Sequence, residues 1–487
     1  MCQTCFDTMA AAGELDGRLQ KFCQCGSPET LFAMRRIEAD ISRRQMLGGM
    51  SAVVGMFAGF GLAPKDARAQ GSGRPVLLTN LRLFDGTGLT LRDGVDILVD
   101  GGRIAALPGR GQGPTDADLI DCGGRAVIPG LIDAHWHTTL ASVSQVAAMT
   151  QEIGFLHLMA GREAGATLQR GFTTVRDVGG PAFGLQAAID RGVVAGPRIF
   201  PAGAILSQTS GHGDFRFSNS LPLMPVDPAD YAMKAGMSAL ADGVPEVLRR
   251  TREQLMKGAS QIKIAAGGGV ASQYDPLDSL QFTEDEMRAA VEAARDWGTY
   301  VCAHVYTSEG IQRCIRAGVR SIEHGQLADE DTVRMMADTG TWWSIQPFLA
   351  DEDANKYTDP KAIAAQKQVA EGTMRAFEWA DKHRVNWAFG TDILYGGGES
   401  QGRQLTKLAR FMSPLAALHR ATGAAGALLA LSGPRAPYDG PLGVIAPDAL
   451  ADLLVVDGDT ESGLDWLASP ENLRLIMKNG QVVKNSL

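Results

Sequence analysis

The stretch AVIPGLIDAHWH, residues 126 to 137, joins an apolar run to two histidines at its end. Its apolar and β-branched residues are typical of a buried strand. Successive side chains of a strand point to opposite faces, so we expect His135 and His137 to point to the same side. Two imidazoles placed in this way can chelate one metal ion, although such a pair taken alone also occurs in ordinary core packing.

Strand-like and helix-like segments alternate along the chain after this stretch. Residues 244–259 have the pattern of an amphipathic helix that leads directly into the strand-like QIKIAAGGG, residues 261–269. Counting the opening stretch, eight strand candidates lie near residues 128, 173, 199, 262, 302, 322, 343 and 388. The alternation predicts an α/β fold, a (β/α)8 TIM-like barrel over 126–435, with a doubly wound sheet as the alternative.

The two ends of the chain share a different pattern. Short apolar or alternating runs separated by turns occupy residues 75–128 and return at 452–485. Asp100-Gly101 and Asn479-Gly480 are typical hairpin turns. We therefore expect residues 70–125 and 436–487 to form one small β-sandwich domain together.

The first 69 residues resemble a bacterial twin-arginine signal peptide with a long leader. Arg43 and Arg44 precede an uncharged apolar stretch at 46–63, and an A-x-A pattern ends at Ala69, where we expect cleavage. Such a signal predicts a periplasmic or secreted protein without stable membrane insertion after processing. A transmembrane anchor is the alternative, which the glycines in the stretch and the adjacent cleavage pattern disfavour.

The cysteines and the net charge argue against a disulfide-rich protein and against a nucleic-acid binder. The leader holds Cys2, Cys5, Cys23 and Cys25, whose spacing matches no established metal motif and which cleavage would remove. The three remaining cysteines imply no disulfide framework. A net charge of −9 and a pI near 5.5, with charged residues of both signs, argue against a general nucleic-acid binder.

Further polar residues fall at the ends of other predicted strands. His304 lies in YVCAHVY, His324 in SIEHG and Asp392 in AFGTD, and Lys263 lies within QIKIAAGGG. A bare ammonium on a buried strand would carry a heavy desolvation cost, which asks for an explanation of this lysine. Barrel enzymes place their chemistry at strand ends, so we expect these residues and the His135–His137 pair to meet.

With these motifs the chain resembles the metal-dependent amidohydrolase superfamily over nearly all of the expected mature chain. The resemblance implies two divalent metal ions, zinc foremost, with manganese and cobalt also suited to the ligands. It implies that His135 and His137 bind the more buried ion and that His304 and His324 bind the more exposed one. It also implies that Asp392 ligates the buried ion and handles protons, and that Lys263 is carboxylated and bridges both ions.

Carboxylation would explain the buried lysine. It converts a cation into a carbamate anion, whose two oxygens can ligate two cations that offset the desolvation cost. A lysine with a pKa lowered by burial supplies the neutral amine that this reaction needs. The alternative is a lysine whose ammonium reaches solvent at the strand end.

The closest subgroup points to a reaction and to two further residues. It includes peptidases that remove a C-terminal residue from dipeptides or N-acyl amino acids, and ochratoxin-type amidases. A hydroxide that bridges the metals would attack an amide beside a free carboxylate. By resemblance, His212 in SQTSGHGDF and Tyr306 in YVCAHVY would polarise the scissile carbonyl. Specificity loops are expected at 205–235, 267–282 and 346–365, and the family's habit suggests a homo-oligomer.

Other readings of the same residues remain open. Three other histidines lie in predicted helices, where we expect a structural role: His157, His383 and His419. Two further residues, Arg176 and Asp177, lie either at the site or along the barrel lining. A ring-opening hydrolase related to imidazolonepropionase would use nearly the same metal ligands. A deaminase fits less well, because HVYTSE lacks a glutamate close to His304. A non-catalytic scaffold on the same fold would be expected to have lost metal ligands.

Overall fold

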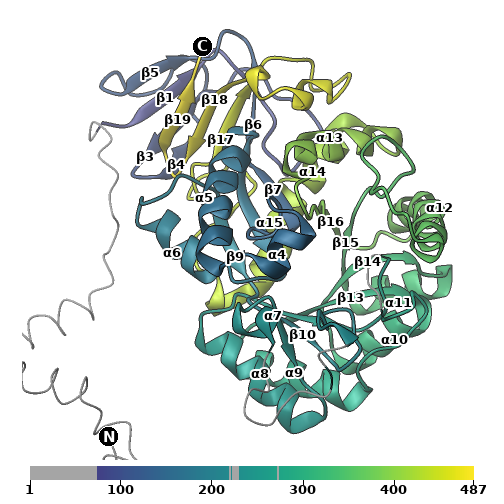
Figure 1. The fold of residues 1–487 in the computed structure, drawn as a ribbon. Helices are drawn as coiled ribbons and strands as arrows, with labels where there is room; N and C mark the ends of the chain where they lie inside the picture. Colours follow the sequence, from purple (N-terminus) through teal and green to yellow (C-terminus); the bar gives the residue numbers. More distant parts are fainter. Residues whose placement is uncertain (1–73, 219–220, 222–229, 271–273) are drawn as a thin grey trace, which may run out of the picture. The chain divides into compact units, whose positions relative to one another are not determined.

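The computed structural model describes residues 74–218, 221, 230–270 and 274–487, which all belong to one compact unit, Gln70–Leu487 (Figure 1). The expected signal peptide lies outside the described residues, with its arginine pair Arg43-Arg44, its four cysteines and the cleavage position after Ala69. The three cysteines in the described part, Cys122, Cys302 and Cys314, are buried and form no disulfide.

The larger part of this unit is a (β/α)8 TIM-like barrel, as expected. Its strands are β7 (Leu131–Trp136), β8 (Phe172–Asp177), β9 (Arg198–Pro201) with β10 (Ile205–Ser207), β12 (Ile262–Ala265), β13 (Val301–Thr307), β14 (Ser321–Leu327), β15 (Trp342–Ile345) and β16 (Trp387–Phe389). One parallel ladder runs β7-β8-β9, and the other joins β10 to β12 and continues in order to β16. The backbone N–H of Asp392 donates to the carbonyl of His135, at 2.8 Å, and so links the two ends.

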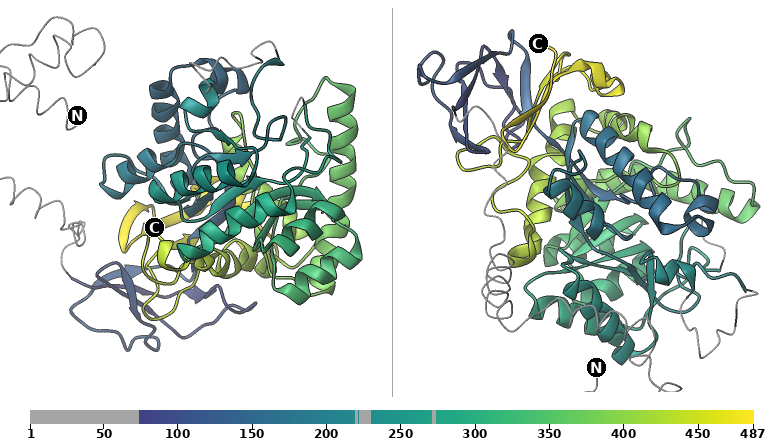
Figure 2. Two further views of the ribbon diagram at one scale, coloured as in Figure 1. Left: turned by 90° about the horizontal axis from the view of Figure 1, so that it is seen from below. Right: turned by 60° about the vertical axis from the view of Figure 1, so that its left-hand side comes forward.

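Helices follow the strands and cover the outside of the barrel (Figure 2). They include α5 (Ile153–Gln169), α6 (Phe183–Asp190), α8 (Val244–Met256), α9 (Glu284–Asp296), α10 (Ser308–Ala317), α11 (Glu330–Thr339) and α12 (Pro360–Lys382). Thr283 and Glu286 form both hydrogen bonds of a capping box at the start of α9. The helices α10 and α11 each end at a glycine with positive φ, which is a common helix stop.

The opening stretch of sequence contains two strands and not one. The candidate near 128 is β6 (Ala126–Pro129), which pairs with β17 (Leu453–Val456) in the small domain, and the barrel begins only at Leu131. Both strands are buried along their whole length, so hydrophobicity does not separate them. Gly130 makes the change of sheet possible, because a side chain there would collide with Thr173 on β8.

The small domain is a β-sandwich built from both ends of the described chain. One sheet has the order β4-β3-β1-β5 and the other the order β19-β18-β17-β6-β2. The strands not yet given are β1 (Val76–Thr79), β2 (Arg82–Leu83), β3 (Ile97–Asp100), β4 (Arg103–Ala106), β5 (Asp118–Asp121), β18 (Leu473–Lys478) and β19 (Gln481–Asn485). Figure 1 shows the purple N-terminal and the yellow C-terminal strands together. Leu78, Ile97, Val127, Leu453 and Leu475 belong to one hydrophobic core between the sheets.

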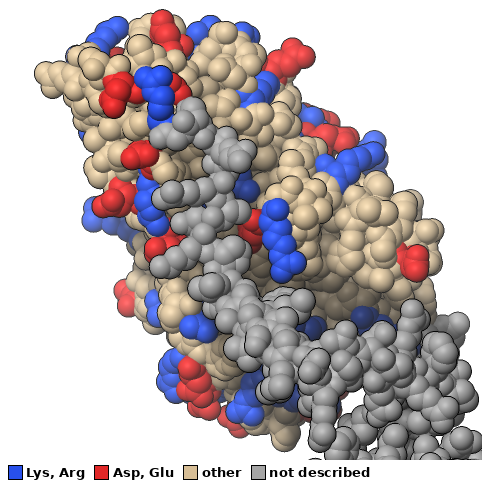
Figure 3. All heavy atoms as spheres, turned by 90° about the vertical axis from the view of Figure 1, so that its left-hand side faces the viewer, with Lys and Arg blue, Asp and Glu red and all other residues tan. Residues whose placement is uncertain are grey.

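The surface carries charged residues of both signs. In the described part of the face shown in Figure 3, basic and acidic side chains are interspersed.

One described segment, Pro414–Arg435, is long and apolar enough to cross a membrane by length and composition. It is broken into α14 (Pro414–Arg420), α15 (Gly423–Leu429) and a 3-10 helix, and Leu418 and Leu428 are buried in the protein, as in the core helices of many soluble proteins.

Candidate active site

Five of the six residues predicted as metal ligands lie in the middle or the carboxyl-terminal part of a barrel strand or just after it, and Lys263 is the second residue of β12. The six are His135 on β7, His137 just after it, Lys263 on β12, His304 on β13, His324 on β14 and Asp392 shortly after β16. The histidines and the lysine are each less than 5% exposed. The structure therefore places the histidines and Asp392 at one rim of the barrel, where loops can bring a substrate to them, with Lys263 inside the strand that adjoins His304.

Three of these residues converge on a point that could hold a metal ion. His135, His324 and Asp392 each offer a ligand atom, and these atoms lie within 4.8 Å of one another. Oδ1 of Asp392 lies 3.1 Å from Nε2 of His135 and 3.2 Å from Nε2 of His137. Burial alone would raise the pKa of Asp392, but His135 and His137 hold it well below its ordinary value.

Unusual backbone and close packing support this geometry. His324 and Asp392 have φ values of 74° and 54°, which lie in the left-handed region that costs a non-glycine residue about 1–3 kcal/mol. Gly390 packs directly on β7, since a Cβ there would lie 2.8 Å from the backbone nitrogen of His135. Strain and tight packing of this kind are typical of functional sites.

His135 is oriented by a buried carboxylate that the sequence analysis missed. Nδ1 of His135 lies 2.8 Å from Glu323, whose two oxygens accept hydrogen bonds from Arg176 at 2.7 Å. Burial would raise the pKa of Glu323, but Arg176 holds it well below its ordinary value. Nε2 of His135 is buried and faces Oδ1 of Asp392, so this imidazole and this carboxylate suit one metal ion.

Arg176 and Asp177 prove to be supporting residues of the barrel lining. Arg176 is fully buried and pairs with Glu323, beneath the histidines. Asp177 accepts hydrogen bonds from the backbone and side chain of Thr138, and from Gly179, whose carbonyl lies 2.9 Å from Nδ1 of His137. Asp177 thus holds the turn that carries His137.

Burial disfavours the charged forms of three further candidate ligands, Lys263, His304 and His324. Desolvation lowers the pKa of Lys263, and it holds the pKa values of His304 and His324 well below their ordinary value. Gln346, which sequence analysis also missed, lies 2.8 Å from Nδ1 of His324 and 3.3 Å from Nδ1 of His135. This amide therefore links two of the three ligands that converge.

Aromatic residues adjoin the exposed side of the histidine cluster. The ring of His212 stacks on His304, with centroids 3.8 Å apart and planes 9° apart. The ring of Tyr306 lies 5.3 Å from His304 and 5.0 Å from His324, and Phe348 lies 6.0 Å from His324. Burial raises the pKa of Tyr306 well above its ordinary value, so its hydroxyl stays protonated and can donate a hydrogen bond.

The glycine run after Lys263 packs against a neighbouring loop. A Cβ on Gly268 would collide with the carbonyl of Pro276, in the loop that folds back over the strand end. The carbonyl of Gly268 also lies 3.1 Å from Nε2 of His304. The run thus packs one loop and orients one histidine.

The other histidines lie away from this cluster, as expected. Nε2 of His383 lies 2.8 Å from Glu330, and Nδ1 of His419 lies 2.8 Å from the carbonyl of Gly86. His157 lies in the middle of α5, and burial lowers its pKa. None of the three takes part in the group of ligands described above.

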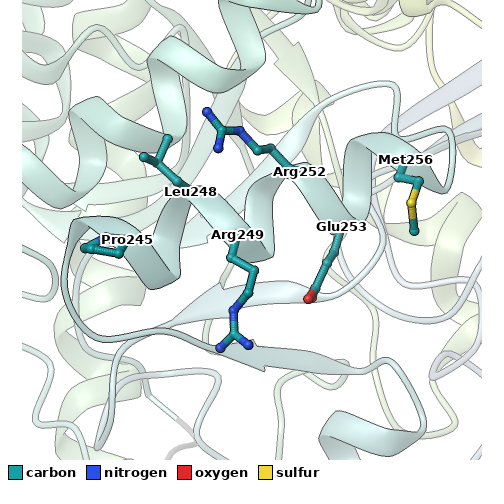
Figure 4. Close-up of a pocket in the computed structure, with 6 residues that line it drawn as sticks. All are labelled: Pro245, Leu248, Arg249, Arg252, Glu253 and Met256. Atoms are coloured by element: carbon teal, nitrogen blue, oxygen red, sulfur yellow. The ribbon is translucent and has the colours of Figure 1, made fainter. Parts of the chain in front are cut away.

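The described surface is hollowed beside the cluster and on an outer helix. One hollow, of about 610 Å³, adjoins the cluster and is lined by Asp275, by Thr307 after Tyr306, by Leu327 at the end of β14 and by the start of α12. The other lies on the outer face of α8, where Leu248 and Met256 are flanked by Arg249, Arg252 and Glu253 (Figure 4). The lining of the first hollow includes Asp275, which contacts His212, and Thr307, the neighbour of Tyr306.

Comparisons with known proteins agree with this arrangement. The amidohydrolase family model matches residues 126–483. Ochratoxinase of Aspergillus niger is 33% identical over 328 residues, which is 65% of this chain and 66% of that protein, just under two thirds of its length.

Solved structures of similar proteins give the same answer. A crystal structure of an amidohydrolase is 36% identical with a TM-score of 0.78, and it covers 85% of this chain and 100% of its own. A prolidase in complex with N-methylphosphonate-L-proline is 35% identical with a TM-score of 0.77, over 84% of this chain and 100% of its own. The chain therefore belongs to the amidohydrolase family.

Proposed function

We propose that the protein is a metal-dependent hydrolase that cleaves an amide bond beside a free carboxylate, as in a dipeptide, an N-acyl amino acid or an ochratoxin-like amide. The observation that carries the proposal is the meeting of potential metal ligands with two carbonyl-polarising candidates at one barrel rim. The names of the relatives support it, because ochratoxinase and prolidase are both among them.

Two divalent ions, zinc foremost, would be held by His135, His137, Lys263, His304, His324 and Asp392. The buried Nε2 of His135 beside Asp392 and the lowered pKa values of His304 and His324 support this ligand set. When bound, such ions would lower the pKa of a water molecule towards about 7 and polarise a carbonyl.

Lys263 would take part as the N6-carboxylated form. Its neutral Nζ attacks carbon dioxide, a C–N bond forms, and one proton leaves to solvent, so the side chain ends with one negative charge. The lowered pKa of Lys263 supports this step, since only the neutral amine has the required lone pair. The resulting anion would complement the positive charge of the two ions.

The remaining residues would move the proton and stabilise charge. The pKa of Asp392 is held low, so its carboxylate can accept the proton of the attacking water and pass it to the leaving nitrogen. Tyr306, which keeps its proton, would donate to the carbonyl oxygen as that oxygen becomes negative. His212, stacked on His304, would act on the same oxygen.

A substrate panel tests the proposal. Enzyme reconstituted with zinc is incubated with dipeptides, N-acyl amino acids and a cyclic amide, and the release of free amino acid is measured together with metal content. We expect release of the C-terminal amino acid, and its loss in His324→Asn. Opening of the cyclic amide without cleavage of any dipeptide would favour the ring-opening alternative. Fewer than about one metal per chain without turnover would favour a non-catalytic scaffold.

A further inference from the structure

Two buried side chains from one segment hold His212 in place. Oδ2 of Asp275 lies 3.2 Å from Nδ1 of His212, and Oε1 of Gln281 accepts the backbone N–H of His212 at 2.8 Å. The side-chain amide of Gln281 also donates to Oδ2 of Asp275, at 3.2 Å. Asp275 is 4% exposed and Gln281 is 1% exposed. His212 is thus held by contacts to both its ring and its backbone.

This segment is itself fixed to the strand that carries Lys263. The backbone N–H of Gln281 donates to the carbonyl of Ala266, at 3.0 Å, and the N–H of Gly268 donates to the carbonyl of Ser279, at 3.1 Å. The collision that a side chain on Gly268 would cause shows how closely the two pieces pack. The position of His212 is therefore set relative to the barrel rim, although its own loop follows a different strand.

The burial of the Asp275 carboxylate opposes folding, which suggests that this residue has a function. Its Oδ1 is buried and has no hydrogen-bond partner among the described residues. Burying a carboxylate with incomplete hydrogen bonding opposes folding, and such groups concentrate at functional sites. The ring that Asp275 contacts is the one that stacks on His304, a candidate metal ligand.

We propose that Asp275, supported by Gln281, is a positioning residue that holds the His212 ring for its action on the substrate carbonyl. Because a carboxylate only accepts hydrogen bonds, Nδ1 of His212 carries the proton at this contact. This inference rests on the proposed amide hydrolysis.

A double-mutant cycle tests whether Asp275 acts through His212. The substrate is the dipeptide or N-acyl amino acid that the unmodified enzyme cleaves fastest. We expect His212→Ala to lower kcat about 100-fold and Asp275→Asn to lower it about 10-fold with little change in KM. In the double variant kcat should be no lower than in His212→Ala alone. Gln281→Met, which removes the Gln281 side-chain bonds to His212 and Asp275, should behave as Asp275→Asn does.

Controls separate positioning from a general loss of structure. Asp296→Asn changes an exposed carboxylate at the end of α9 and should leave kcat, metal content and Tm unchanged. Asp275→Asn should keep its metal content. Additive effects of Asp275→Asn and His212→Ala, or an unchanged kcat in Asp275→Asn, would overturn the inference alone. Absence of turnover by the unmodified enzyme on every amide would instead refute the proposed function, and the inference with it.

Discussion

At the scale of single residues, burial determines what Lys263 can do. An ammonium at 3% exposure is disfavoured, and the pKa of this amine is lowered accordingly. Carboxylation would remove the unfavourable cation and place an anion between the two groups of histidines. The strand position of the lysine was visible in the sequence, whereas its burial could only be expected from its apolar neighbours.

Lys263→Ala should therefore remove the bridge between the two proposed metals. We expect fewer than two firmly bound ions per chain and loss of amide hydrolysis, measured by metal analysis after dialysis against a weak chelator. Lys257→Ala, an exposed lysine just before the same strand, is the matched control and should retain both. Two tightly bound ions with full activity in Lys263→Ala would refute the bridging role.

The residues that support the ligands, such as Glu323 and Asp275, could not be predicted from sequence patterns. The candidate ligands could be found because they share a position, at the end of a predicted strand. Glu323 contacts a histidine 188 positions away, and Asp275 contacts one 63 positions away. Contacts of this kind depend on which strands become neighbours in the barrel. Glu323 was nevertheless adjacent to His324, where a buried acidic residue is a usable signal.

At the scale of elements, the positions of the candidate strands were predicted correctly, but one strand was assigned to the wrong domain. The candidates near 173, 199, 262, 302, 322, 343 and 388 all fall in barrel strands. The candidate near 128 belongs to the β-sandwich, because β6 and β7 are both apolar and only Gly130 separates them. Short β10 and β11 (Ser238–Leu240) were not anticipated, since three-residue strands carry little periodicity.

The packing of β16 on β7 gives a prediction at this scale. Gly390→Ala would place a methyl group 2.8 Å from the backbone nitrogen of His135 and 3.0 Å from Oγ of Ser344. We expect the overpacking to cost about 1–3 kcal/mol of unfolding free energy and to weaken metal retention by displacing His135. Denaturant unfolding and metal analysis measure the two effects.

Gly184→Ala provides the comparison for this substitution. Gly184 lies within α6, and a Cβ there would meet nothing within 4 Å. Its replacement should be neutral or stabilising by up to about 1 kcal/mol, because alanine is the better helix former. Equal stability and equal metal content in the two variants would show that β16 and β7 do not need this close approach.

At the scale of the whole described unit, the β-sandwich depends on both ends of the chain. The pairing of β6 with β17 places residues more than 300 positions apart in one sheet. Arg198 on β9 of the barrel forms two hydrogen bonds of 3.1 Å to Asp452, which directly precedes β17. Both side chains are less than 10% exposed, so this pair joins barrel and sandwich in a setting with little solvent screening.

Removal of one partner should show how strongly this pair joins the two domains. Asp452→Ala leaves Arg198 buried without its carboxylate, and we expect a loss of about 3–5 kcal/mol in unfolding free energy, measured with urea. Glu461→Ala breaks the exposed pair between Arg82 on β2 and the C-terminal segment, and it should cost less than about 1 kcal/mol. Neither residue lies at the barrel rim, so kcat of the folded enzyme should not change. Equal losses in the two variants would mean that burial does not strengthen the Arg198–Asp452 pair.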